Sequence, residues 1–219
     1  MSVEIEVKYY VKDIEALKYR LQVLGARPRQ ARTSEINYRF DTSTGRLTRN
    51  KQVLRLRKDN HSRLTYKSPS RDEGGARSRQ EIEITVSDFD AAVELLQALG
   101  YKVSLIYEKI RTIYSLNQVL ICVDELPLGH FIEIEGSSSD DIRAMSHHLG
   151  LNWETRLSQS YSALFEHVQK IQSLPFRDMT FANFVGLHIS ADTLGVSPAD
   201  TISNYADDGN DDSSPSNDI

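Results

Sequence analysis

The sequence is short of cysteine and of long apolar runs, and each shortage excludes a class of protein. Cys122 is the single cysteine in 219 residues, so no disulfide can form within the chain. No apolar run approaches the roughly 18 residues that span a bilayer, and no charged-then-apolar leader precedes the opening MSVEIEV. We therefore expect a cytoplasmic protein without membrane contact, in which Cys122 is a buried structural thiol.

Common phosphate and zinc motifs are missing as well. The chain has neither GxxxxGK[ST] nor GxGxxG, so any phosphate must be bound by side chains rather than by a glycine-rich loop. His147 and His148 fall in an expected helix with no further ligand at a useful spacing, which argues against a zinc site.

The net negative charge of the chain is confined to its C-terminal part, and the rest is nearly balanced. Residues 170–219 contain eight Asp and no Glu against Lys170 and Arg177, so their net charge is −6. Since the net charge of the whole chain is −5, residues 1–169 have a net charge of +1. The segment DDGNDDSSPSND is typical of disordered, solvated chain. We expect one folded domain over residues 1–171 and an acidic, largely disordered extension over 172–219. The stretch FRDMTFANFVGLHI in this extension has Phe176, Phe181 and Phe184, enough to dock on the barrel or on an unidentified partner, and the sequence does not separate these two options.

Eight segments of the folded part alternate between apolar and polar residues, which is typical of strands. Four segments with helical spacing of apolar residues lie among them, at 12–25, 87–100, 138–150 and 157–171. Short turns separate several strands, so antiparallel hairpins are expected. The expected strands cover residues 3–11, 31–42, 52–58, 62–69, 78–86, 104–116, 118–126 and 130–136.

The polar faces of these strands carry like charges two residues apart, such as Glu4 with Glu6 and Arg55 with Arg57. Side chains at that spacing share one face and repel, so an outer face gains nothing from them. The set is also balanced. Its acids are Glu4, Glu6, Glu81, Glu83, Asp124, Glu133 and Glu135, and its bases are Lys8, Arg55, Arg57, Lys67, Arg79, Lys109 and Arg111.

A balanced set of this kind fits the inside of a closed barrel whose apolar outer face is covered by helices. Ions are costly to bury without partners, so a wet tunnel that binds a charged ligand is the natural reason to keep them. Arginine forks match phosphate oxygens, and paired carboxylates bind hard divalent cations. The residues therefore predict a tunnel for a metal–polyphosphate complex.

EIEVK, residues 4–8, fits the E-x-E-x-K signature of the CYTH, or triphosphate tunnel metalloenzyme, superfamily, and later segments resemble the family's blocks in order. These segments are VLRLRK, LTYKSP, RQEIEITV, EKIRTIY, VDELPLGHFIEIEG and SYSALF, and the resemblance spans roughly residues 3–168. It implies an α+β fold, an eight-stranded antiparallel closed β-barrel with helices packed outside. Residues 1–171 would then be the tunnel domain.

The resemblance also implies roles for the charged residues. Glu4, Glu6, Glu133 and Glu135 would bind catalytic Mg²⁺ or Mn²⁺, with Asp124 as a further ligand or a support for one. Glu81 and Glu83 would orient basic residues or water, and Glu4, Glu6 and Lys8 would belong to the catalytic set with them. Triphosphate would be gripped by Lys8, Arg55, Arg57, Lys67, Lys109 and Arg111.

Two departures from the family pattern concern phosphate binding. Gln159 stands before Ser160 and Tyr161, where many members carry a basic residue, so one contact is absent or comes from Arg156. Arg39 stands where an aromatic residue is common. It is either an added basic group at the tunnel rim or a surface arginine.

Several functions remain open on this basis. The first is a metal-dependent phosphohydrolase acting on inorganic tripolyphosphate, thiamine triphosphate or a nucleoside triphosphate. The second is an adenylyl cyclase that converts ATP to cyclic AMP and pyrophosphate in the same tunnel. The sequence shows no adenine pocket, which favours hydrolysis. A barrel that binds polyphosphate or nucleic acid without catalysis is a third, and the carboxylates argue against nucleic acid because they would repel its backbone.

Overall fold

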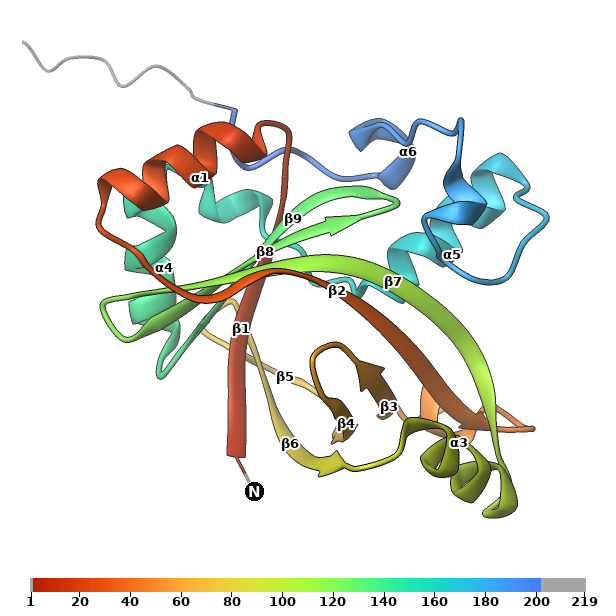
Figure 1. The fold of residues 1–219 in the computed structure, drawn as a ribbon. Helices are drawn as coiled ribbons and strands as arrows, with labels where there is room; N and C mark the ends of the chain where they lie inside the picture. Colours follow the sequence, from red (N-terminus) through yellow and green to blue (C-terminus); the bar gives the residue numbers. More distant parts are fainter. Residues whose placement is uncertain (1, 202–219) are drawn as a thin grey trace, which may run out of the picture.

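The computed structural model describes residues 2–201 and is built around one antiparallel sheet that closes on itself. The hydrogen-bonded order is β1-β9-β8-β7-β2-β3-β4-β6, and β6 pairs again with β1, so eight strands form a ring (Figure 1). The short β5 pairs with β6 outside the ring. The expected eight-stranded antiparallel barrel is confirmed. Strand β5 was not predicted, because its three residues show no alternation of apolar and polar side chains.

The strands are long where the ring curves most. Their bounds are β1 Ser2–Val11, β2 Arg27–Thr42, β3 Val53–Lys58, β4 Ser62–Lys67, β5 Arg71–Glu73, β6 Ala76–Val86, β7 Tyr101–Leu116, β8 Val119–Leu126 and β9 Gly129–Gly136. The longest pair, β2 with β7, has register shifts between Pro28 and Thr33 and at Arg39. Such irregularities bend a strand locally, which helps the sheet close.

Helices cover the outer face of the ring. Their bounds are α1 Ile14–Val23, α2 Arg46–Arg49, α3 Phe89–Ala98, α4 Ser139–His148, α5 Tyr161–Gln172 and α6 Ala191–Leu194, with 3₁₀ turns at Trp153–Thr155 and Ala182–Phe184. The longer helices begin where a side chain can accept a hydrogen bond from the first turn. Asp13 accepts from the Ala16 amide and Ser160 from the Ala163 amide. None of the helices in residues 2–201 is both long and apolar enough to cross a bilayer.

The alternation of β1 resolves into an inner charged face and an outer apolar face. Val7 and Tyr9 are buried in a core shared with α1 and α4, whereas Glu6 and Lys8 lie on the other face. The cover is incomplete at β6, where Ile82 and Ile84 are 46% and 54% exposed. The expected helical cover of the apolar outer face is therefore incomplete at this strand.

The first part of the expected extension is packed against the ring. Met179 exchanges backbone hydrogen bonds with Ile106 and Glu108 of β7, and it is fully buried with Phe184 and Leu194 among the side chains of α5. The Asp200 carboxylate accepts hydrogen bonds from the amides of Lys12 and Asp13. Residues 172–201 thus pack on one end of the barrel through their apolar residues, which is one of the two options left open for the stretch that contains Phe176 and Phe184. Residues 202–219, with the acidic run, lie outside the described part.

Truncating Met179 tests whether this segment contributes to the fold. Met179→Ala removes a side chain with 0% exposure, so we expect it to lower the free energy of unfolding by about 2–5 kcal/mol. Val185→Ala is the matched control, because Val185 lies nearby in the same segment but is 82% exposed, and its effect should stay within about 0.5 kcal/mol. Urea unfolding followed by circular dichroism measures both. Equal stabilities of the two variants would contradict a structural role for the segment.

Candidate active site

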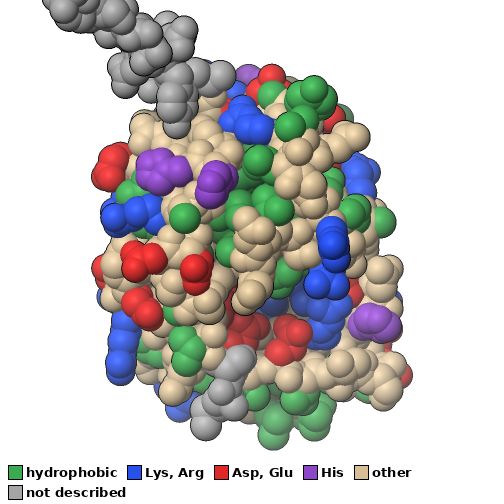
Figure 2. Space-filling view, turned by 90° about the vertical axis from the view of Figure 1, so that its left-hand side faces the viewer, with side chains coloured by type: hydrophobic (Ala, Val, Ile, Leu, Met, Phe, Trp, Pro, Cys, Tyr) green, Lys and Arg blue, Asp and Glu red, His purple; other side chains and the backbone are tan. Residues whose placement is uncertain are grey.

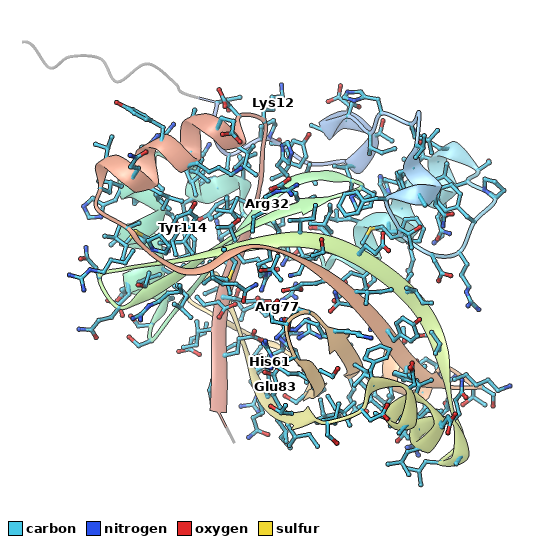
Figure 3. All side chains as sticks on the ribbon, viewed as in Figure 1. Lys12, Arg32, His61, Arg77, Glu83 and Tyr114 are labelled. Carbon is cyan, nitrogen blue, oxygen red and sulfur yellow. The ribbon has the colours of Figure 1, made fainter. Side chains whose placement is uncertain are left out.

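A cavity of about 400 Å³ lies inside the ring, and charged side chains line it. Every acid and base expected from the strand pattern reaches it apart from Asp124, which is fully buried in the wall. Figure 2 shows acidic and basic side chains together in a recess of the surface, and Figure 3 shows Arg77 and Glu83 among the side chains inside the ring. The strand alternation therefore brings together residues that lie far apart in the sequence.

Three carboxylates form the tightest acidic group of this cavity. One oxygen from each of Glu4, Glu6 and Glu135 lies within 4.8 Å of the others, because Glu6 and Glu135 are opposite each other on β1 and β9. Burial, together with the charges of Glu133, Glu4 and Glu6, outweighs the opposing charge of Arg111 and raises the pKa of Glu135 to about 7. The Cys122 thiol lies 3.9 Å from the Oε1 atom of Glu135.

The other two carboxylates of the group already have cations beside them. Lys67 lies 2.8 Å from Glu4, and Arg79 lies 3.0 Å from Glu4 and 3.3 Å from Glu6. Although burial raises the pKa of Glu4, the charges of Lys67 and Arg79 outweigh it and lower that pKa to about 2. Among the described residues, Glu135 is therefore the carboxylate of this group with no cation within 4.0 Å, and it marks where a further positive charge would be stabilised.

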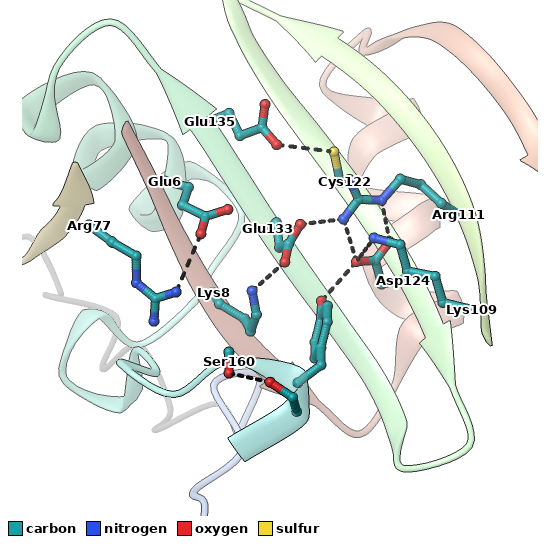
Figure 4. A network of polar contacts seen from close by, with 12 residues as sticks. Glu6, Lys8, Arg77, Lys109, Arg111, Cys122, Asp124, Glu133, Glu135 and Ser160 are labelled. Atoms are coloured by element: carbon teal, nitrogen blue, oxygen red, sulfur yellow. Dashed lines mark hydrogen bonds and ion pairs between the residues drawn. The ribbon is translucent and has the colours of Figure 1, made fainter. Parts of the chain in front are cut away.

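A second group of charges is buried beside the cavity and is fully paired (Figure 4). Arg111 donates two hydrogen bonds of 2.6 Å to Asp124, which also accepts from Lys109 at 3.1 Å and from the Tyr161 hydroxyl at 2.8 Å. Glu133 accepts from both Lys8 and Arg111. Asp124 and Glu133, expected as metal ligands, are thus held by cations and lie outside the Glu4–Glu6–Glu135 group.

The remaining expected residues line the opposite wall. Lys67 lies 3.0 Å from Glu81, and Arg57 lies 3.7 Å from Glu83. The Thr65 hydroxyl donates to Glu83 at 2.9 Å. Glu81 therefore contacts Lys67 and Glu83 contacts Arg57, and the orienting role of the two glutamates stays a prediction.

Four residues of the site were not expected from the charge pairs. Glu35 is 2% exposed and lies 3.6 Å from both Arg57 and Lys109. Arg77 lies 3.7 Å from Glu6. Tyr161, in the first turn of α5, has the Lys8 ammonium 4.2 Å from its ring centre, and Arg39 lines the cavity beside Ser162. Glu35 and Arg39 share the inward face of β2, so the alternation of SEINYRF is the signal that could have found them.

The chemistry of the site suits a divalent cation and a polyanion together. Carboxylate oxygens are the ligands that Mg²⁺ and Mn²⁺ prefer, and the surplus negative charge at Glu135 fits such an ion. Guanidinium forks bind phosphate oxygens in pairs, and several line the same cavity. One chamber thus combines a cluster of carboxylates with a lining of lysine and arginine side chains.

Comparison with known proteins agrees with this geometry. A model of the CYTH domain matches residues 2–145. A protein of Methanocaldococcus jannaschii, provisionally named an adenylate cyclase, is 29% identical over 140 residues, which are 63% of this chain and 79% of that protein. A solved structure from Pyrococcus horikoshii is 30% identical, covers 72% of this chain and 96% of its own, and has a TM-score of 0.62.

A further solved structure, from Hippeastrum, shares the fold with a TM-score of 0.55 and 17% identity, covering 74% of this chain and 95% of its own. Its description reports a dominant triphosphatase activity for a protein first assigned as an adenylyl cyclase. The matched residues 2–145 contain the ring strands and the three clustered carboxylates. This chain belongs to the CYTH domain family.

Proposed function

We propose that the protein is a divalent-metal-dependent phosphohydrolase that acts on a triphosphate bound inside the ring. The observation that carries the proposal is the presence, in one cavity, of the Glu4–Glu6–Glu135 carboxylates and a lining of lysine and arginine side chains. Residues 1–171 supply this cavity, and the packed part of 172–201 covers one end of the barrel from outside. The carboxylates of the lining disfavour a nucleic acid as the ligand.

Glu4, Glu6 and Glu135 would hold the Mg²⁺ or Mn²⁺ ion. When bound, such an ion neutralises charge on phosphate oxygens and favours a nucleophile at neutral pH. Lys8, Arg55, Arg57, Lys67, Lys109 and Arg111 would grip the phosphates through charge-assisted hydrogen bonds. Glu81 and Glu83 would hold Lys67 and Arg57 in place between turnovers. Positioning and charge neutralisation are the main tasks of a protein in phosphoryl transfer.

The network around Asp124 would keep two of these bases in one orientation. Arg111 has five N–H donors, and its contacts with Asp124 and Glu133 fix the guanidinium plane. The ring of Tyr161 packs under the Lys8 ammonium and its hydroxyl contacts Asp124. We infer that Asp124 and Glu133 position Lys8, Lys109 and Arg111 rather than bind the metal.

An adenylyl cyclase is the second candidate, and the name of the Methanocaldococcus jannaschii relative favours it. The two reactions use the same grip on the triphosphate and differ in the nucleophile. Water at the terminal phosphorus gives orthophosphate, whereas the ribose 3′-hydroxyl at the α-phosphorus gives cyclic AMP and pyrophosphate. The tunnel is lined mostly by ions and offers few apolar side chains to a base, which supports hydrolysis.

Phosphorus NMR of the products separates the two candidates. The purified protein is incubated with inorganic tripolyphosphate, thiamine triphosphate or ATP, each with Mg²⁺, with Mn²⁺ or with EDTA. We expect orthophosphate to appear with at least one substrate and only when a metal is present. Cyclic AMP with pyrophosphate from ATP would establish the cyclase instead, and no turnover under any condition would leave a non-catalytic polyphosphate-binding protein.

A further inference from the structure

Two arginines of the tunnel lack a carboxylate partner. Among the described residues, every other lysine or arginine that lines the cavity has a carboxylate oxygen within 4.0 Å. Arg39 and Arg55 have none within that distance, and their hydrogen bonds are to neutral side chains. Arg39 donates to the Ser162 hydroxyl, and Arg55 contacts the Thr65 hydroxyl at 3.5 Å and the Tyr107 hydroxyl.

The pairing of β2 with β3 places the two arginines next to each other. Arg39 of β2 and Arg55 of β3 are register partners, so both side chains leave the same inward face. Like charges directly opposite each other destabilise a strand pair. The charges of Glu35 and Glu81 act on Arg55 from beyond ion-pair distance, and an anion between or beside the two arginines would relieve the remaining repulsion.

Neighbouring groups show the same surplus of positive charge. Burial raises the pKa of the Tyr107 hydroxyl, but the charges of Arg55 and Lys109 outweigh it and lower that pKa below its ordinary value. Asn37, the next inward residue on β2, is 0% exposed and neither polar atom of its amide has a partner. The wall beside Arg39 thus contains a polar group that protein contacts leave unsatisfied.

This positive end lies away from the carboxylate group. Arg39 contacts Ser162, in the first turn of α5, and Ser160 caps that helix. In Figure 4, Ser160 and Glu135 lie at opposite ends of the network, with Lys8 and Glu133 between them. The first turn of α5 adds the partial positive charge of a helix N-terminus. The tunnel is therefore polarised, with surplus negative charge at Glu135 and surplus positive charge at Arg39.

We propose that Arg39 is a specificity-determining residue which, with Arg55, binds the phosphate remote from Glu4, Glu6 and Glu135. A free terminal phosphate carries more charge than a phosphate esterified to an organic group, and it needs no room for a substituent beside α5. The tunnel therefore selects an unsubstituted linear polyphosphate over a triphosphate ester. This inference rests on the proposed function for the orientation of the substrate.

Binding in EDTA tests the inference without turnover. Isothermal titration calorimetry is performed with inorganic tripolyphosphate and with ATP, on the wild type, Arg39→Gln, Arg39→Lys and Arg29→Gln. We expect Arg39→Gln to weaken tripolyphosphate binding about 10-fold or more, as the loss of a charge-assisted contact implies, and ATP binding by less than about 3-fold. Arg39→Lys should restore part of the tripolyphosphate affinity, since it keeps the charge but not the fork.

Arg29→Gln is the matched control, because Arg29 is an exposed arginine of the same strand whose contact is Ser115. It should leave both affinities unchanged. A purely structural role for Arg39 would lower both affinities by the same factor, and that result, or an unchanged preference, overturns the inference. Failure of tripolyphosphate to bind the wild type overturns it too. The wild type could bind tripolyphosphate selectively, and Arg39→Gln could lose that selectivity, while no metal-dependent turnover is found. That result would contradict the proposed phosphohydrolase and still support the phosphate subsite at Arg39.

Discussion

Replacing Glu135 with glutamine is expected to abolish turnover while leaving the protein folded. Glu135 shares the cluster with Glu4 and Glu6 but, among the described residues, has no cation within 4.0 Å. Glutamine keeps the shape of the side chain and removes the charge. If the metal supplies several kcal/mol of charge stabilisation in the transition state, we expect kcat to fall by about 10³-fold.

The effect on stability should have the opposite sign. Three carboxylates within 4.8 Å repel one another in the absence of a metal, so neutralising one of them relieves the free protein. We expect the thermal midpoint of Glu135→Gln in EDTA to equal or exceed that of the wild type. A loss of activity accompanied by a lower midpoint would indicate misfolding rather than a missing metal ligand.

Two further measurements sharpen this test. Mn²⁺ should raise the thermal midpoint of the wild type and leave that of Glu135→Gln nearly unchanged, because a ligand stabilises only the state that binds it. Glu94→Gln, on the outer helix α3, is the matched control and should keep both activity and the response to Mn²⁺. Full activity in Glu135→Gln would remove this residue from the metal site.

Much of the fold could be predicted because charge pairs and turn signals recur along the sequence. Period two separates two faces in every ring strand, and the balanced charges indicated which face turns inward. The docking of residues 172–201 was left undecided by the sequence, because they form short turns around single buried side chains such as Met179 and Phe184. Isolated anchors of this kind have no period for a sequence pattern to detect.

The candidate site could be predicted in its composition but not in its pairing. Alternation places Asp124 in the barrel wall, yet whether a metal or an arginine meets it depends on the register of β7 with β8, which puts Arg111 opposite Asp124. Register follows from long-range packing and cannot be derived from one strand. For the same reason the sequence did not show that Arg39 faces Arg55, or that the Tyr161 hydroxyl reaches Asp124.

Asp124→Asn is expected to produce the largest loss of stability in the barrel. The Asp124 side chain is 0% exposed and accepts hydrogen bonds from Arg111, Lys109 and Tyr161. Asparagine removes the charge that balances two buried cations. Breaking a buried ion pair on one side costs about 3–5 kcal/mol, and we expect urea unfolding to show a loss of that size.

Two comparisons assign the loss to the buried network rather than to a metal site. Tyr161→Phe deletes one hydrogen bond to a charged acceptor and should cost about 1–3 kcal/mol, whereas Asp140→Asn on the exposed first turn of α4 should stay within about 0.5 kcal/mol. Because the partners of Asp124 are cations of the chain itself, the loss in Asp124→Asn should be the same in EDTA and in Mg²⁺. A loss seen only with Mg²⁺ would instead identify Asp124 as a metal ligand, since the cost would then come from binding and not from the two buried cations.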